Sequence, residues 1–157
     1  MANYIKKKVE SLTKKYKTNN PYELAEHLGF NILLWDLHPD ILGFYKYEKK
    51  TKWIVINENS AEQERYFTCG HELGHGVFHT RLNTPYLRSD TIFSVNRFEK
   101  EANSFAVELM IPDELWTNFV RNYTPISEIS KITGIPEEIL NLKTVKKMGG
   151  ENYARWR

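Results

Sequence analysis

The sequence predicts an α+β fold that is mainly helical, with a small antiparallel β-sheet of about three strands beside one central helix. The first observation is that apolar residues recur at helical spacing in several segments, as a helix with one buried face requires. The second is a group of short segments rich in aromatic and β-branched residues, which favour strands. The third is size, because 157 residues without a linker-like stretch suit one domain. We therefore expect a single domain covering 1–157.

Two helices and then the sheet are expected in the N-terminal half. A lysine-rich segment over 3–17 has apolar residues at helical spacing and predicts an amphipathic helix. Asn20 and Pro21 open a second helix, because asparagine caps helix N-termini and proline is tolerated in the first turn. That helix ends at Gly29. Three strands are expected next, one over 31–36 and a hairpin of 43–47 and 52–56.

Two further helices are expected around a loop. The first covers about 61–79 and is the one expected beside the sheet. The second covers 97–110, where the apolar residues form one arc at about 100° per residue. Residues 80–95, with a proline and mixed polarity, are expected to form the loop between these helices.

The helix over 61–79 carries an HExxH motif that begins at His71 and ends at His75. Four residues along a helix correspond to ~6 Å of rise and ~40° of rotation, so the two imidazoles share one face. Such a pair can bind one Zn²⁺ ion, with Glu72 beside it as the base that takes a proton from water. The motif also arises by chance, so a third ligand is required.

His79 continues the four-residue spacing, but we expect it to support the ligands and not to be one. It lies eight residues from His71, or ~12 Å along the helix axis, whereas each zinc–nitrogen bond spans ~2 Å. His79 is therefore expected at the helix end or beside the ligands.

Glu99 is the expected third ligand. It lies with Asn103 inside or at the edge of the apolar arc of the helix over 97–110, and a carboxylate that faces a core is unfavourable unless paired or coordinated. Zinc would supply that partner; a surface ion pair or a helix cap is the alternative. Asn103 is a candidate to orient a ligand. Glu101 points to the opposite side of the helix and is expected to be an ordinary solvated charge.

Small residues predict close contact between these two helices. Gly70 and Gly74 are four residues apart on the first, and Ala102 and Ala106 are four apart on the second. Glycine inside a helix costs roughly 0.5–1 kcal/mol relative to alanine, so some other requirement should maintain it. Close approach of the two helices is the expected reason, and it would bring Glu99 near the histidines.

The segment 124–146 has the outline of a helix-turn-helix, with two short helices joined at Gly134. A DNA-reading helix places its first residues against base edges, but here those residues are Glu137 and Glu138, which phosphate would repel. We therefore expect a structural or substrate-docking helix pair and no direct contact with nucleic acid. A DNA-binding regulator that uses residues 126–142 is the alternative.

Composition favours a cytoplasmic protein that does not enter a membrane. No apolar run approaches the ~20 residues of a membrane span, and the N-terminus lacks a signal-like apolar core. Cys69 is the one cysteine, so no internal disulfide can form and a reducing compartment is expected. The net charge is only +2. The lysine clusters are expected to be solvated faces: Lys6–Lys8, Lys14, Lys15, Lys143, Lys146 and Lys147.

Together, the residues of the motif and its surroundings resemble the ImmA/IrrE family of metallo-endopeptidases. The resemblance rests on the motif with His79, on Glu99-Lys-Glu-Ala-Asn-Ser-Phe-Ala106 running into Pro112, and on the segments Thr18-Asn-Asn and Ile56-Asn-Glu-Asn59. Within that family the chain looks most similar to the stand-alone ImmA-type proteases of phages and integrative elements. The resemblance implies a zincin-like fold, with His71, His75 and Glu99 as zinc ligands and Glu72 as catalytic base.

The expected function is therefore that of a zinc-dependent endopeptidase with one bound Zn²⁺. By resemblance, its protein substrate is a helix-turn-helix (XRE-like) repressor, and cleavage would relieve repression of a phage or mobile element. The alternative is a non-proteolytic, zinc-stabilised regulatory module that binds a repressor or DNA. Glu72 separates the two, because a binding module has no need of a base at that position.

Overall fold

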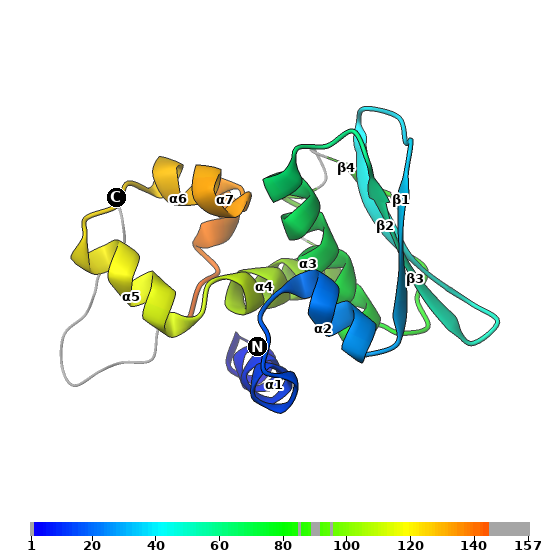
Figure 1. Cartoon of the computed structure of the whole chain (residues 1–157), viewed down its shortest axis with the longest axis horizontal. Coiled ribbons are helices and arrows are strands. Elements are labelled where there is room, and N and C mark those ends of the chain that lie inside the picture. Colours follow the sequence, from blue (N-terminus) through cyan, green and yellow to red (C-terminus); the bar gives the residue numbers. More distant parts are fainter. Residues whose placement is uncertain (1, 85, 89–91, 95, 145–157) are drawn as a thin grey trace.

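A computed structural model describes residues 2–84, 86–88, 92–94 and 96–144 of the chain (Figure 1). The first half contains two helices, three strands and a long helix: α1 (Ala2–Tyr16), α2 (Pro21–His27), β1 (Phe30–Trp35), β2 (Ile41–Glu48), β3 (Thr51–Asn57) and α3 (Glu62–Phe78). The second half is mostly helical: β4 (Leu87–Arg88), α4 (Arg97–Met110), α5 (Asp113–Arg121), α6 (Ile126–Thr133) and α7 (Glu137–Leu140). The elements before β4 lie within one or two residues of the predicted boundaries.

The predicted α+β class is confirmed, although the sheet differs in two details. Its strand order in the described residues is β1-β3-β2-β4. The β2–β3 pair is the predicted antiparallel hairpin, whereas β1 pairs with β3 in parallel. The parallel pair arises because the hairpin folds back and places β3 between β1 and β2. The fourth strand, β4, comes from the segment expected to be only a loop, and it pairs with β2 near Ile41 and Gly43.

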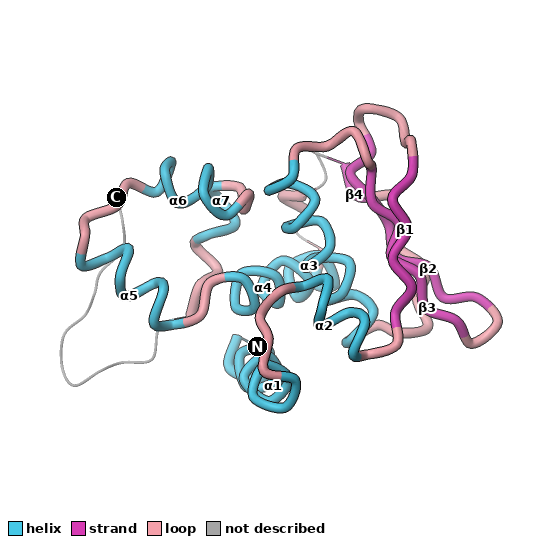
Figure 2. The backbone as a smooth tube through the Cα atoms, in the orientation of Figure 1, coloured by secondary structure: helices cyan, strands magenta, loops and turns pink. Residues whose placement is uncertain are grey.

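All of the helices lie on one side of the sheet (Figures 1 and 2). Cys69 and Leu73 of α3 belong to the same buried core as Tyr45 and Ile54 of the sheet. Phe105 of α4 joins this core from the far side of α3. The HExxH helix is therefore held between the sheet and α4, and both neighbours fix its orientation.

A second core joins the C-terminal helices to α4. It contains Val107 of α4, Trp116 of α5, Ile129 of α6 and Ile139 of α7, all less than one-tenth exposed. Among the residues that the structure describes, none of the helices has the length and hydrophobicity that a membrane crossing needs.

The two short helices α6 and α7 are joined at Gly134. Its φ of 73° is a left-handed conformation that glycine adopts without steric cost. A Cβ at this position would lie 2.2 Å from the backbone oxygen of Gln63, so the turn packs closely against the start of α3. The last residues of the pair predicted over 124–146, including Lys146, lie outside the described residues, as does Lys147.

Two of the lysines predicted to be solvated are instead buried. The Nζ atom of Lys6 lies 2.6 Å from a carboxylate oxygen of Asp113, and its side chain is 6% exposed. The Nζ atom of Lys143 lies 2.7 Å from Glu108 and 2.8 Å from Asp113, and its side chain is 1% exposed. That prediction was wrong because α1, which carries Lys6, and the segment after α7, which carries Lys143, both pack against the charged side of α4.

Candidate metal centre

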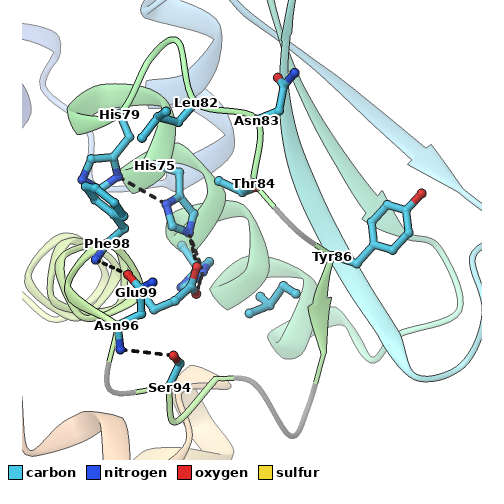
Figure 3. A pocket seen from close by; sticks show the side chains of 12 residues that line it. His75, His79, Leu82, Asn83, Thr84, Tyr86, Ser94, Asn96, Phe98 and Glu99 are labelled. Carbon is cyan, nitrogen blue, oxygen red and sulfur yellow. Dashed lines mark hydrogen bonds and ion pairs between the residues drawn. The ribbon is translucent and has the colours of Figure 1, made fainter.

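Three predicted ligand residues meet at one point between α3 and α4. The Nε2 atoms of His71 and His75 are 3.1 Å apart. One carboxylate oxygen of Glu99 lies 3.2 Å from the Nε2 atom of His71, and the other lies 3.2 Å from that of His75. Figure 3 shows the side chains of His75 and Glu99 pointing toward each other across the gap between their helices. The structure therefore brings together the three residues that the sequence singled out.

Helix geometry and small residues explain this convergence. His71 and His75 are one turn apart on α3, and Asn96 caps the start of α4 by accepting a hydrogen bond from the backbone nitrogen of Phe98 (2.8 Å). A Cβ on Gly74 would lie only 3.0 Å from the Cα of Ala102. The missing side chain thus lets α4 approach α3 closely, and the approach carries Glu99, in the first turn of α4, to the histidines.

Burial and charge within the cluster shift the pKa values of its members. Burial lowers the pKa of His75 to about 4. The pKa of His71 rises, since hydrogen bonding and charge from Glu99 and the nearby charge of Glu72 outweigh the effect of burial. The pKa of Glu99 falls well below its usual range, because hydrogen bonds to the two histidines outweigh its burial. The carboxylates of Glu72 and Glu99 therefore favour a positive charge between them. His75, whose pKa is lowered, is neutral at pH 7 and has a lone pair free on one ring nitrogen.

Glu72 is buried beside this cluster and is only partly satisfied. Its side chain is 1% exposed, and one carboxylate oxygen accepts a hydrogen bond from the hydroxyl of Thr84 at 3.4 Å. The other oxygen, Oε1, has no hydrogen-bond partner among the residues that the structure describes. Burial raises the pKa of Glu72 to about 7. A buried carboxylate oxygen without a partner is costly, so this position points to a further group, such as a reacting water molecule.

Asn103 supports His71 as the sequence suggested. Its side-chain oxygen lies 2.7 Å from Nδ1 of His71, and its side-chain nitrogen donates to the backbone oxygen of Ile92 at 2.8 Å. The second bond fixes the amide so that its oxygen faces the imidazole. His71 therefore donates from Nδ1 and leaves the lone pair of Nε2 toward the cluster.

His79 caps α3 and stands behind His75, in keeping with its predicted supporting place. Its Nδ1 atom lies 3.4 Å from Nδ1 of His75, while its Nε2 atom lies 2.7 Å from a carboxylate oxygen of Glu101. Arg97 donates from Nε to the other oxygen of Glu101 at 2.9 Å. The supporting set thus includes Glu101 and Arg97, which sequence reasoning did not assign to the site.

The prediction that Glu101 is a solvated charge was wrong, since the residue is 3% exposed. The prediction took account only of the apolar face of α4, which contacts the first core. The opposite face is also covered, by the end of α3 through His79 and by α1. The pKa of Glu101 is lowered, because the bonds from Arg97, His79 and Tyr4 outweigh its burial. The available signal in the sequence was His79 itself. It lies one helical turn after His75, and a histidine in that position can pair with an acidic residue such as Glu101.

A cavity of about 320 Å³ opens over the cluster (Figure 3). The three candidate ligands form its floor together with His79, and the segment after α3 contributes Thr84 and Tyr86 to its wall. The sequence did not assign a role to Thr84, which links this wall to Glu72.

The donor set fits a small metal cation. Two imidazole nitrogens and one carboxylate are a ligand set used by metal-dependent hydrolases, and the ligand atoms all lie within 4.8 Å of one another. A tetrahedral ion with bonds of about 2.0–2.1 Å separates its ligand atoms by roughly 3.3 Å. The observed separations of 3.1–3.2 Å are close to that value.

Comparison with known proteins agrees with this geometry. Residues 25–144 match the Peptidase_M78 family, described as the IrrE N-terminal-like domain. The chain is 46% identical over 144 residues to "Uncharacterized immunity region protein 2" of Bacillus phage phi105, covering 92% of this chain and 91% of that protein. It is 35% identical over 111 residues to metallopeptidase ImmA of Bacillus subtilis (strain 168), covering 71% of this chain and 65% of ImmA. The chain therefore belongs to the ImmA/IrrE family of metallopeptidases, as the residues around its HExxH motif predict.

Proposed function

We propose that this protein is a zinc-dependent endopeptidase in which His71, His75 and Glu99 bind one Zn²⁺ ion and Glu72 is the catalytic base. The observation that carries the proposal is the meeting of three metal-binding atoms next to a buried glutamate with an unpartnered oxygen. A structural metal site would be closed by a fourth protein ligand, whereas this cluster opens into a cavity.

The chain supplies most of the chemistry through groups of fixed orientation. A bound zinc ion would polarise the scissile carbonyl and acidify a water molecule. Glu72 takes a proton from the attacking water and returns it to the leaving amine, and a pKa of about 7 suits both steps near neutral pH. Thr84 holds one oxygen of Glu72, which leaves the other free for the proton. Asn103 and His79 keep the two imidazoles turned toward the ion.

A peptidase acts on a protein, and we propose a helix-turn-helix repressor of the XRE type as that protein. The name of the phage phi105 relative refers to an immunity region, and phage immunity is the context in which we place the substrate. Cleavage would inactivate the repressor and induce the phage or mobile element. The same proposal places the enzyme in the cytoplasm, and it requires no contact between the enzyme and DNA.

The test compares three proteins for zinc content and for cleavage of β-casein and of the repressor. The wild-type protein should bind one zinc ion and cut. Glu72→Gln should keep the metal and lose roughly 10²–10⁴-fold in kcat, because it removes general-base catalysis alone. His75→Ala should lose both metal and cleavage. If Glu72→Gln cuts as fast as wild type, the proposed base is wrong. If it no longer cuts but still inactivates the repressor, the protein acts as a zinc-stabilised binding module.

A further inference from the structure

We propose that the open face of the β-sheet docks an apolar, uncharged segment of the protein substrate while a neighbouring segment enters the metal cavity. This inference rests on the proposed peptidase function. We define the docking face by Leu33 of β1, Trp53 and Val55 of β3, and Phe44 of β2, together with Tyr86 just before β4.

An apolar row crosses the outer side of the sheet, and none of the elements that the structure describes covers it (Figure 1). Leu33 and Phe44 both lie in register with Val55, so the three side chains form one apolar row across three strands. Leu33 and Trp53 are 38% and 36% exposed. Their strand neighbours Ile32 and Ile54 face the other way, into the helix-covered core. A sheet with one solvated face normally carries polar residues there, so an apolar outer row indicates a binding surface.

The docking face continues into the metal cavity through one shared wall. Asn83, Thr84 and Tyr86 line both the cavity over the metal ligands and a groove of about 590 Å³ on the outer face of the sheet. The ring of Tyr86 packs on that of Phe44, with centroids 5.0 Å apart. In Figure 3 the side chain of Tyr86 points away from His75.

The wall formed by Asn83, Thr84 and Tyr86 contacts Glu72, the proposed base, and is hydrogen-bonded to strand β2. Thr84 hydrogen-bonds to Glu72 on one side and accepts a bond from the backbone nitrogen of Tyr45 on the other, at 3.1 Å. Asn83 accepts a bond from the backbone nitrogen of Tyr47 at 2.7 Å. A polypeptide lying in the groove therefore reaches the catalytic residues across a wall that is fixed to β2.

Charge in the groove favours an uncharged occupant. The charged residues that line it are Lys46 and Glu48, which form an ion pair with each other at 3.1 Å. The docking face therefore presents the aromatic rings of Phe44, Trp53 and Tyr86 and aliphatic side chains, without net charge. Such a surface suits an apolar, uncharged segment that lays its side chains across the sheet, with recognition by shape and burial.

The experiment uses zinc-loaded protein with two probes, β-casein and a four-residue peptide copied from a casein cleavage site, which spans only ~14 Å when extended. Trp53→Ser and Leu33→Ser should each raise KM for casein by about tenfold, the size of effect expected for a central interface residue. Both variants should hydrolyse the short peptide at the wild-type rate, because the peptide does not reach the groove. Tyr123→Ser, which alters a side chain 84% exposed in the turn after α5, is the control and should match wild type on both probes.

Casein affinity measured in the Glu72→Gln background separates docking from catalysis. Weaker binding by Glu72→Gln/Trp53→Ser than by Glu72→Gln supports the docking face, even if wild type proves unable to cut. Equal KM values for casein in wild type, Trp53→Ser and Leu33→Ser would overturn the docking face and leave the peptidase intact. Sedimentation would measure the oligomeric state of Trp53→Ser and Leu33→Ser. If that state changes while casein affinity does not, the face binds a second copy of the chain and the docking proposal is overturned.

Discussion

His79 and Glu101 form a buried pair behind the metal centre, with Nε2 of His79 2.7 Å from a carboxylate oxygen of Glu101. Since a carboxylate accepts, His79 donates from Nε2, and its Nδ1 atom can accept a hydrogen bond from the Nδ1–H group of His75. This arrangement leaves the lone pair of His75 Nε2 facing His71 and Glu99. The acidic residue that sequence reasoning assigned to solvent therefore orients a metal ligand through an intervening histidine.

Glu101→Ala should accordingly weaken zinc binding by about 10–100-fold, the usual effect of removing a residue that orients a ligand. Competition with a chelating dye would measure the affinity. Glu101→Gln should lose less, because the amide oxygen still accepts from His79. Lys100→Ala, which changes the exposed neighbouring residue, is the control. Equal zinc affinity in Glu101→Ala and Lys100→Ala would show that the pair does not position His75.

Gly74→Ala should destabilise the protein by about 1–3 kcal/mol and weaken zinc binding, because the new Cβ would press on the backbone of α4 and move Glu99 away. Gly70→Ala is a matched control on the same helix. Its Cβ would lie 3.4 Å from its nearest neighbours, which is ordinary contact, so it should gain about 0.5–1 kcal/mol from helix propensity. Urea denaturation and dye competition would measure both effects. Similar responses to the two substitutions would contradict the close-approach argument.

Lys143→Ala should lower the free energy of unfolding by about 3–5 kcal/mol, because it leaves the carboxylate of Glu108 buried without its closest cation. Denaturant unfolding would measure the loss. Lys131→Ala, in the exposed part of α6, should change stability little. A loss below 1 kcal/mol for Lys143→Ala would mean that Lys6, which lies 3.7 Å from Glu108, neutralises it alone.

The cluster of candidate ligands could be located from sequence because its members follow local rules. His71 and His75 are related by helical spacing, and Glu99 stood out as a charge on an apolar arc. The same reasoning failed for Glu101, Lys6 and Lys143, for one shared reason. A helical arc identifies the face of α4 toward its largest neighbour, but not the further elements, α1 and the segment after α7, that pack against the rest of α4. Contacts between elements far apart in the chain decided these three residues.

The sheet illustrates the same limit. The β2–β3 hairpin is local, and its turn could be read from the residues between the strands. The parallel position of β1 beside β3 and the pairing of β4 with β2 depend on how separate segments meet. The wall shared by the metal cavity and the docking face follows from that pairing, so neither Thr84 nor Tyr86 could be given a role from sequence.

Asp113 should make stability depend on pH in the acidic range. Its pKa is lowered, because bonds from Lys143 and Lys6 outweigh its partial burial. A carboxyl group whose folded pKa is depressed stabilises the protein above its unfolded pKa of about 3.9, and that contribution disappears as pH falls through the folded value. Asp113→Asn should therefore be less stable than wild type at pH 6, and the difference should shrink as pH falls below the unfolded pKa of about 3.9. Urea unfolding of both proteins across this range would measure the difference. A gap that stays constant with pH would mean that Asp113 contributes by packing, since asparagine resembles only the protonated acid.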